Sequence, residues 1–180
     1  MVSDNKKTLS GNEIFFDDDD IIVSKTDLTG KLTYGNRTFY RLAGRSEQEC
    51  IGQPHNIIRH PEMPRCIFKL LWDTVKDGQE LFASVNNRSA NGDNYWVFAH
   101  VTPSLDSQGN ITGYHSNRRV ANREVLDQHI IPLYKALLQI EKSIASPREA
   151  LLASSSRIEE ILKENNMSFN EWMFSLNASH

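Results

Sequence analysis

The stretch GQPHNIIRHPEMP, residues 52–64, decides how the rest of this chain is interpreted, because it joins imidazole, amide and guanidinium side chains to three prolines. Proline lacks a backbone N–H, and the residue before a proline is displaced from the helical region. We therefore predict a short irregular turn that carries His55, Asn56, Arg59 and His60. Binding residues concentrate in loops held by a rigid scaffold, so this turn is predicted to line a ligand site.

The segments on either side of the turn have the pattern of β-strands. The predicted strands are residues 21–25 and 31–34, joined by a turn at 26–30, and residues 81–88, 95–102 and 111–116. Asn91 and Gly92 separate the third and fourth of these strands and predict a tight hairpin, because both residue types tolerate positive φ. The sequence thus indicates about five strands interrupted by one helical region.

Helical signals fill that region and the C-terminal third of the chain. Asn36 opens a first helical segment, Ser46 with Glu49 resembles a capping box, and residues 64–75 have helical spacing that ends at Gly78. After residue 119 three apolar stripes follow the helical period: Leu126, Ile130, Leu133, Leu137 and Ile140; Ile158, Ile161 and Leu162; and Phe169, Trp172, Met173 and Leu176.

Composition excludes several classes of function. The chain has 180 residues, 39% of them hydrophobic, and a net charge of −3 without a basic stripe, which argues against nucleic-acid binding. Its apolar runs are far shorter than the roughly 20 residues that cross a bilayer, so membrane insertion is not expected. Cys50 and Cys66 are the only cysteines and are expected to be reduced, which makes a soluble cytoplasmic protein the default. No P-loop, zinc spacing or nucleophile–histidine motif indicates an enzyme or a metal site.

From about residue 26 to residue 134 the sequence resembles the PAS domains of bacterial aerotaxis receptors. The resemblance rests on residues 52–56, on Arg59-His60-Pro61 and Met63-Pro64, on Phe68 and Trp72, on Asn87-Arg88, and on residues 91–93, 95–97 and 132–137. It implies an α+β fold in which a five-stranded antiparallel sheet and short helices enclose a cofactor pocket, with C-terminal helices added. It also implies a redox or oxygen sensor that binds FAD without a covalent bond and signals in aerotaxis-like chemotaxis.

By this resemblance the flavin pocket comprises Asn36, Arg59, His60, Phe68, Trp72 and Asn87, to which the turn adds His55 and Asn56. The chemistry of these groups suits a flavin, because guanidinium pairs with phosphate or carbonyl charge, aromatic faces stack on rings, and amides bond to flavin edge atoms. The sequence departs from the family at Glu62, where aspartate is usual, and at Phe82, where tryptophan is usual. On pattern alone Phe68 and Trp72 also fit a core pair, and His60 a hydrogen-bonded structural histidine.

Two other cofactor chemistries and one other functional class compete with a flavin sensor. A haem-binding PAS gas sensor would need an axial histidine, for which His55, His60, His100 and His115 are candidates. A light-sensing flavin domain of the LOV type needs a cysteine beside the flavin, and His55 stands at the corresponding position. A small flavoenzyme is the alternative from a different class.

We divide the chain into an acidic N-terminal extension (residues 1–19), a PAS sensor domain (20–120) and a C-terminal helical extension (121–180). The aspartates at 17–20 are expected to form a solvated tail. The apolar stripes of the C-terminal extension are expected to be exposed and to bind a protein partner or a second copy of the chain.

Overall fold

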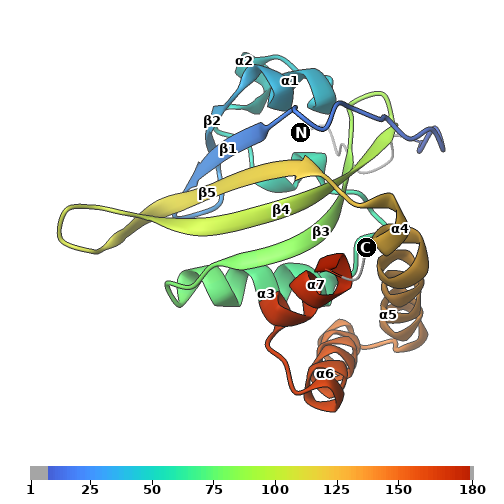
Figure 1. Cartoon of the computed structure of the whole chain (residues 1–180). Coiled ribbons are helices and arrows are strands. Elements are labelled where there is room, and N and C mark those ends of the chain that lie inside the picture. The colour runs from blue at the N-terminus through green and yellow to red at the C-terminus, as the bar shows by residue number, and fades with distance from the viewer. Residues whose placement is uncertain (1–7, 179–180) are drawn as a thin grey trace.

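In the computed structural model, which describes residues 8–178, five antiparallel strands form one sheet in the spatial order β2-β1-β5-β4-β3 (Figure 1). The strands are β1 (Ile22–Asp27), β2 (Leu32–Gly35), β3 (Leu81–Arg88), β4 (Asn94–Leu105) and β5 (Ile111–Val120). The predicted α+β class with a five-stranded antiparallel sheet is confirmed. Because β5 pairs with both β1 and β4, the last strand lies in the centre of the sheet.

Three strands extend by two or more residues beyond the predicted limits, and one of them is β4, which continues to Leu105. Strand β1 continues to Asp27 and β5 to Val120, and the two pair from Ile22 opposite Arg118 onward. The sequence prediction ended β5 at residue 116, before the polar residues at 117–119. The hairpin between β3 and β4 forms as predicted, but only Gly92 has a positive φ, whereas the Asn91 side chain bonds to Asp93.

The helices begin where the local signals predict. They are α1 (Arg37–Ala43), α2 (Glu47–Cys50), the 3-10 turn η1 (His55–Ile58), α3 (Arg65–Lys76), α4 (Arg123–Val125), the π-helical turn η2 (Leu126–Ile130), α5 (Ile131–Ser143), α6 (Pro147–Asn165) and α7 (Phe169–Ala178). Asn36 caps α1, and Ser46 with Glu49 forms the capping box of α2. The proline-rich turn is η1 together with the bend that follows it.

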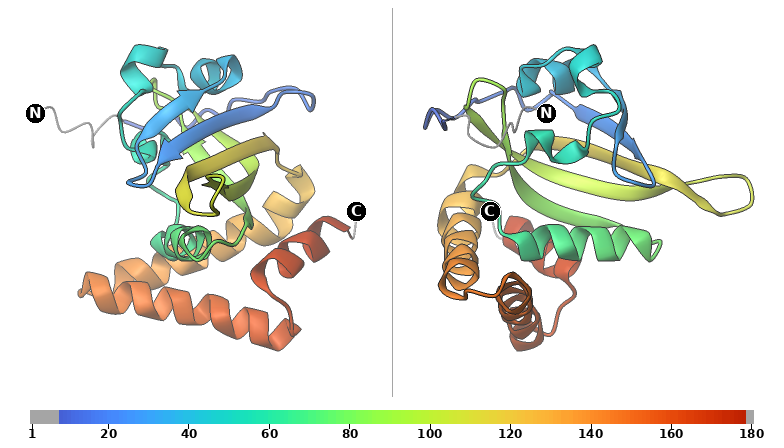
Figure 2. Two further views of the ribbon diagram at one scale, coloured as in Figure 1. Left: turned by 90° about the vertical axis from the view of Figure 1, so that its left-hand side faces the viewer. Right: turned by 180° about the vertical axis from the view of Figure 1, so that it is seen from behind.

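The helical segments lie on different sides of the sheet (Figures 1 and 2). Seen from behind, η1 and the bend after it cross in front of the sheet and lead into α3, which runs along β3 and β4. Helix α5 continues from β5 by way of α4 and η2, α6 packs against α5 and α3, and α7 returns to β3. No helix in residues 8–178 combines the length and the apolar character that a membrane span requires.

Residues of the three C-terminal apolar stripes pack against other parts of the same chain. Leu137, Ile158 and Met173 are buried in the hydrophobic core, together with Phe169. The expectation that these stripes are exposed is therefore wrong for these residues, because α6 and α7 fold back against α3 and β3 instead of projecting into solvent.

Residues 8–19 of the N-terminal extension lie along the sheet instead of forming a detached tail. The amide of Ile14 donates to the carbonyl of Asn94 (2.7 Å), and the rings of Phe16 and Tyr95 meet edge to face. Three of the four aspartates at 17–20 are exposed, as predicted, while Asp20 pairs with Arg41 at 2.6 Å. Residues 1–7 lie outside the described part of the chain.

Candidate functional site

A cavity of about 370 Å³ lies between the sheet, the proline-rich turn and α3. Its lining comes from β1 (Ser24, Thr26), the β1–β2 turn (Thr29, Gly30), the proline-rich turn (Pro54, His55, Asn56, Ile58, Arg59), α3 (Phe68, Lys69, Leu71, Trp72) and strands β3 to β5 (Val85, Asn87, Ala99, Val101, Tyr114, His115, Ser116, Arg118). The volume is in the range of ligand-binding pockets, roughly 300–1,000 Å³. Thr29, Asn56 and Lys69 are exposed and mark its mouth.

Arg118 is the group that most sharply defines the chemistry of the cavity. Its side chain is only 2% exposed, its Nη2 donates to Ser24 Oγ, and its guanidinium lies over the Phe39 ring, 5.4 Å from the centroid. Burial lowers the pKa of Arg118 to about 10, so the group remains charged at neutral pH. No carboxylate pairs with it in residues 8–178. Buried charges are normally paired, so this cavity suits a ligand with electron-rich oxygen or nitrogen atoms.

Three buried polar atoms of the lining have no hydrogen-bond partner within the described structure. They are Nε of Arg118, Nδ2 of Asn87 and Oγ1 of Thr26. An unsatisfied buried polar group costs about 1–3 kcal/mol, and such groups are rare in folded proteins. Two of the three are donors, and the hydroxyl can donate as well. The lining is therefore suited to a planar ligand with several acceptors at its edge.

His55 forms the end of a short hydrogen-bonded chain with Ser24 and Arg118. The Nε2 atom of His55 lies 2.9 Å from Ser24 Oγ, the same oxygen that accepts from Arg118. Burial, reinforced by the charge of Arg118, lowers the pKa of His55 to about 3. Because the imidazole is neutral at physiological pH, the Ser24 hydroxyl can donate its proton to Nε2. The chain holds the guanidinium of Arg118 in place.

We expect the stability of the protein to fall as the pH is lowered below about 6.5. The unfolded chain protonates His55 near its ordinary pKa, whereas the folded chain does so only near 3. The contribution of His55 is therefore complete above about pH 6.5, and each pH unit below it removes up to about 1.4 kcal/mol from the free energy of unfolding. Urea unfolding at about pH 7 and about pH 5 measures this loss.

The variant His55→Gln keeps an amide next to Ser24 but has no imidazole to protonate. Between the higher and the lower pH it should therefore lose less stability than the wild type. The exposed His129→Gln is the matched control and should behave like the wild type. Equal losses in the wild type and in His55→Gln would show that His55 does not carry this dependence.

Aromatic side chains form the wall of the cavity on the side of α3. The guanidinium of Arg59 lies 4.1 Å from the centroid of the Phe68 ring, and its Nη2 donates to the carbonyl of Met63 at 3.1 Å. Burial lowers the pKa of Arg59, against the opposing charge of Glu141. Trp72 meets the ring of Tyr114 edge to face at 5.3 Å. The cavity therefore combines flat apolar surfaces with the guanidinium groups of Arg59 and Arg118.

The structure brings six of the eight predicted site residues to this cavity: His55, Asn56, Arg59, Phe68, Trp72 and Asn87. Asn36 does not line it, because its Oδ1 accepts from Phe39 N (2.9 Å) and Val23 N (3.1 Å) and its Nδ2 donates to Ile21 O (2.7 Å). His60 does not line it either, and its Nδ1 accepts from the Glu62 amide at 3.2 Å. Both residues occupy supporting positions, one at the start of α1 and the other in the bend before α3.

Sequence reasoning missed Arg118, Ser24 and Thr26. Alternation along β5 places Tyr114, Ser116 and Arg118 toward the cavity, so a charged residue at an inward position was the available signal. Because the predicted strand ended at residue 116, it did not include Arg118, and this signal was not recognised. Phe82, which replaces the usual tryptophan, stacks on His100 at 4.1 Å and does not line the cavity.

Within residues 8–178 no group of three or more histidine, cysteine, aspartate or glutamate side chains could hold a metal ion. The described residues that line the cavity include no carboxylate and no cysteine. The described lining residues offer a ligand hydrogen-bond donors, positive charge and aromatic rings.

A family model and curated relatives of known sequence both match this chain. Residues 32–118 match the family model described as the PAS fold. The aerotaxis receptor of Escherichia coli (strain K12) is 44% identical over 120 residues, which cover 67% of this chain and 23% of the receptor. The nitrogen fixation regulatory protein of Klebsiella pneumoniae is 28% identical over 99 residues, 55% of this chain and 20% of that protein. The chain thus spans about a quarter or less of the length of these curated relatives.

Solved structures show the same fold at low identity. An RNA-binding light-oxygen-voltage receptor superimposes with a TM-score of 0.55 at 20% identity, covering 64% of this chain and 34% of that chain. The light-state LOV structure of the blue-light photoreceptor Aureochrome1 gives a TM-score of 0.53 at 21% identity, covering 62% of this chain and 88% of that chain. At these identities the likeness concerns the fold alone.

Proposed function

Because this chain carries a PAS domain of the aerotaxis-receptor type, we propose that it is a sensor that binds FAD non-covalently in the cavity between the sheet and α3. Phe68 and Trp72 would contact the ring, while Asn87, Thr26 and Arg118 would bond to its edge. Arg59, together with Lys69 at the mouth of the cavity, would pair with the negatively charged phosphates of FAD, which lie away from the ring. When bound, the flavin supplies reversible electron uptake.

The observation that carries this proposal is the buried guanidinium of Arg118 without a carboxylate, beside two further unpaired polar atoms. A flavin ring has carbonyl oxygens and ring nitrogens along one edge and two apolar faces. The donors of Arg118 and Asn87 suit that edge, and the aromatic wall formed by Phe68 and Trp72 suits the faces. The lining thus matches the chemistry of a flavin at both its polar and its apolar surfaces.

The positions of the histidines favour a flavin over haem. Of the four candidate axial ligands, His60 and His100 do not line the cavity, and His100 Nε2 lies 2.6 Å from Glu80 on the other side of the sheet. His55 lines it, but its Nε2 is engaged with Ser24. Only His115 remains without such a bond among the described candidates that line the cavity.

The lack of acidic and cysteine side chains in the described lining also bears on the remaining alternatives. A light-driven adduct needs a cysteine thiol next to the ring. A flavoenzyme usually needs a positioned acid or base near its substrate, and no carboxylate of the described lining supplies one. We therefore favour a sensor whose output, in aerotaxis-like signalling, passes through α5, α6 and α7 to a protein partner.

We expect the purified protein to be yellow, with the absorbance spectrum of an oxidised flavin, because the cavity would hold the cofactor by several contacts. Heating should release it, and chromatography of the supernatant should identify FAD, not FMN. A Soret band would instead establish haem. Folded protein that stays colourless after incubation with excess FAD would contradict the proposal.

A further inference from the structure

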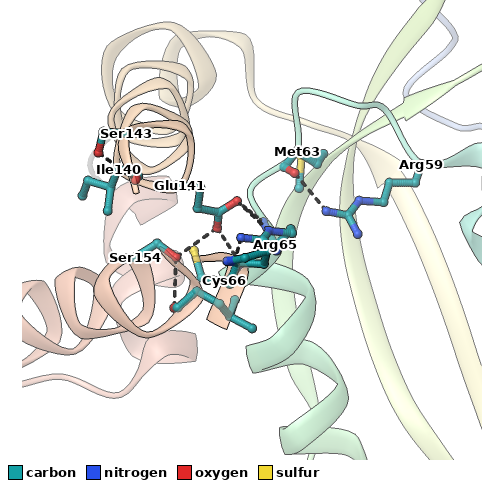
Figure 3. Close-up of polar contacts among 10 residues, drawn as sticks. Arg59, Met63, Arg65, Cys66, Ile140, Glu141, Ser143 and Ser154 are labelled. Atoms are coloured by element: carbon teal, nitrogen blue, oxygen red, sulfur yellow. Dashed lines mark hydrogen bonds and ion pairs between the residues drawn. The ribbon is translucent and has the colours of Figure 1, made fainter. Parts of the chain in front are cut away.

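The N-terminus of α3 has no cap from its own neighbourhood. Pro64 stands at the capping position and offers no side-chain acceptor. The carboxylate of Glu141, in the last turn of α5, replaces such a cap: it accepts the amides of Arg65 and Cys66, each at 3.0 Å (Figure 3). The first N–H groups of a helix need acceptors, and negative charge is favoured there. A residue 76 positions away therefore completes the helix that forms one wall of the cavity.

The same carboxylate also reaches α6. Ser154, which is fully buried in α6, donates its hydroxyl to Glu141 Oε1 at 2.9 Å (Figure 3). Arg65 Nη2 donates to the carbonyl of Pro147 at 3.1 Å. The Glu141 side chain is 6% exposed. Burial acts to raise the pKa of Glu141, but the donors from Arg65, Cys66 and Ser154 lower it overall. One ionised carboxylate thus joins α3, α5 and α6.

The cavity contacts the same turn from its other side. Arg59 lies over Phe68 and donates to the carbonyl of Met63, two residues before Arg65 (Figure 3). The start of α3 is therefore held by Arg59 on the cavity side and by Glu141 on the side of the C-terminal helices. A ligand that drew the Arg59 guanidinium toward itself would displace the Met63 carbonyl and, with it, the two amides that Glu141 caps.

We propose that Glu141 is a latch through which the cavity controls the docking of α6 on α3. The far end of α5 is held separately, since Tyr134 Oη donates to the carbonyl of Ser84 at 2.7 Å. Loss of the Glu141 contacts therefore weakens the docking of α6, while α5 stays attached to the sheet. The choice of FAD as the ligand that acts on this latch rests on the proposed function. The coupling between Arg59 and Glu141 is inferred from their contacts and does not depend on that choice.

The test is amide hydrogen exchange of α6 (Pro147–Asn165) in four ligand-free proteins: the wild type, Arg59→Ala, Glu141→Gln and the double variant. Glu141→Gln should speed exchange in α6 by about tenfold or more. Arg59→Ala should speed it by a smaller factor, and the double variant should exchange no faster than Glu141→Gln alone, because both act on one contact. Effects that multiply, or no effect of Arg59→Ala on α6, would overturn the latch.

Two further variants keep the test specific. Glu159→Gln makes the same change at an exposed position of α6 and should leave exchange unaltered. Ser154→Ala removes only the donor from α6 and should speed exchange in the same direction, which retains a test if Glu141→Gln fails to fold. Unchanged exchange in Ser154→Ala would count against the latch.

A final arm adds FAD to the wild type and to Glu141→Gln. FAD should change the exchange of α6 at least about threefold in the wild type and not in Glu141→Gln, while both proteins retain flavin to within about twofold. If the chain binds no flavin, the proposed function fails, and the four-variant comparison still decides whether the latch exists. If flavin binds and shifts α6 equally in both proteins, the latch fails alone.

Discussion

Replacing Arg118 with methionine is expected to lower flavin retention at least about a hundredfold, or about 2.7 kcal/mol. The variant removes the buried cation and its donors, including the unpaired Nε, while a chain of similar length remains. Charge-assisted hydrogen bonds contribute about 1.5–3 kcal/mol each, so the loss of one or two accounts for this magnitude. The ratio of flavin to protein absorbance after gel filtration measures retention.

The ligand-free protein should respond in the opposite direction. Burying a cation without a counter-ion is unfavourable, so Arg118→Met should unfold at an equal or higher urea concentration than the wild type. The neighbouring Arg119→Met is the matched control, since Arg119 is exposed and does not line the cavity. Wild-type flavin content in Arg118→Met, or equal losses in both variants, would remove Arg118 from the site.

Replacing Ala99 with phenylalanine is expected to lower flavin retention at least about tenfold without preventing folding. Ala99 is buried in the middle of β4 and lines the cavity. A larger side chain there enters the space that the ring would occupy, because the inward face of the strand points at α3. The change does not alter charge, so it tests the location of the ligand independently of Arg118.

Ala136→Phe makes the same substitution at an exposed position of α5 and should leave retention unchanged. Thermal unfolding of both ligand-free variants shows whether the fold survives; overpacking costs typically about 1–3 kcal/mol. Ala99→Phe protein that folds and still holds flavin at the wild-type ratio would place the flavin elsewhere.

The charges of the site explain why Arg118→Met should act on binding more than on folding. Arg59 and Arg118 are both cationic at neutral pH, His55 is neutral, and no carboxylate is among the described residues of the lining. The charge of Arg118 therefore has no carboxylate partner among the described residues, whereas the charge of Arg59 is opposed in part by Glu141, which lies outside the lining. A ligand with negative charge or strong acceptors relieves this imbalance, and removing a cation weakens that ligand while easing the ligand-free fold.

The sequence by itself determined the local structure. The caps at Asn36 and at Ser46 with Glu49, the proline-rich turn and the hairpin at Gly92 depend on residues within a few positions of one another, so their signals are readable along the chain. Six of the eight predicted site residues line the cavity because that turn and the inner face of α3 carry most of them.

Only the tertiary structure decided the contacts between distant segments. Arg118 meets Ser24 across 94 positions, and Glu141 caps α3 across 76. The strand order β2-β1-β5-β4-β3 and the packing of α6 and α7 against the domain also depend on contacts between segments that are distant in the sequence. Contacts of this kind leave no periodic pattern in the sequence of either segment. The hydrogen-bond partner of each polar group lies far away along the chain, so the spacing of nearby residues does not indicate it. The physical reason is that burial, which packing alone sets, decides whether a charged side chain on a strand faces solvent or a cavity.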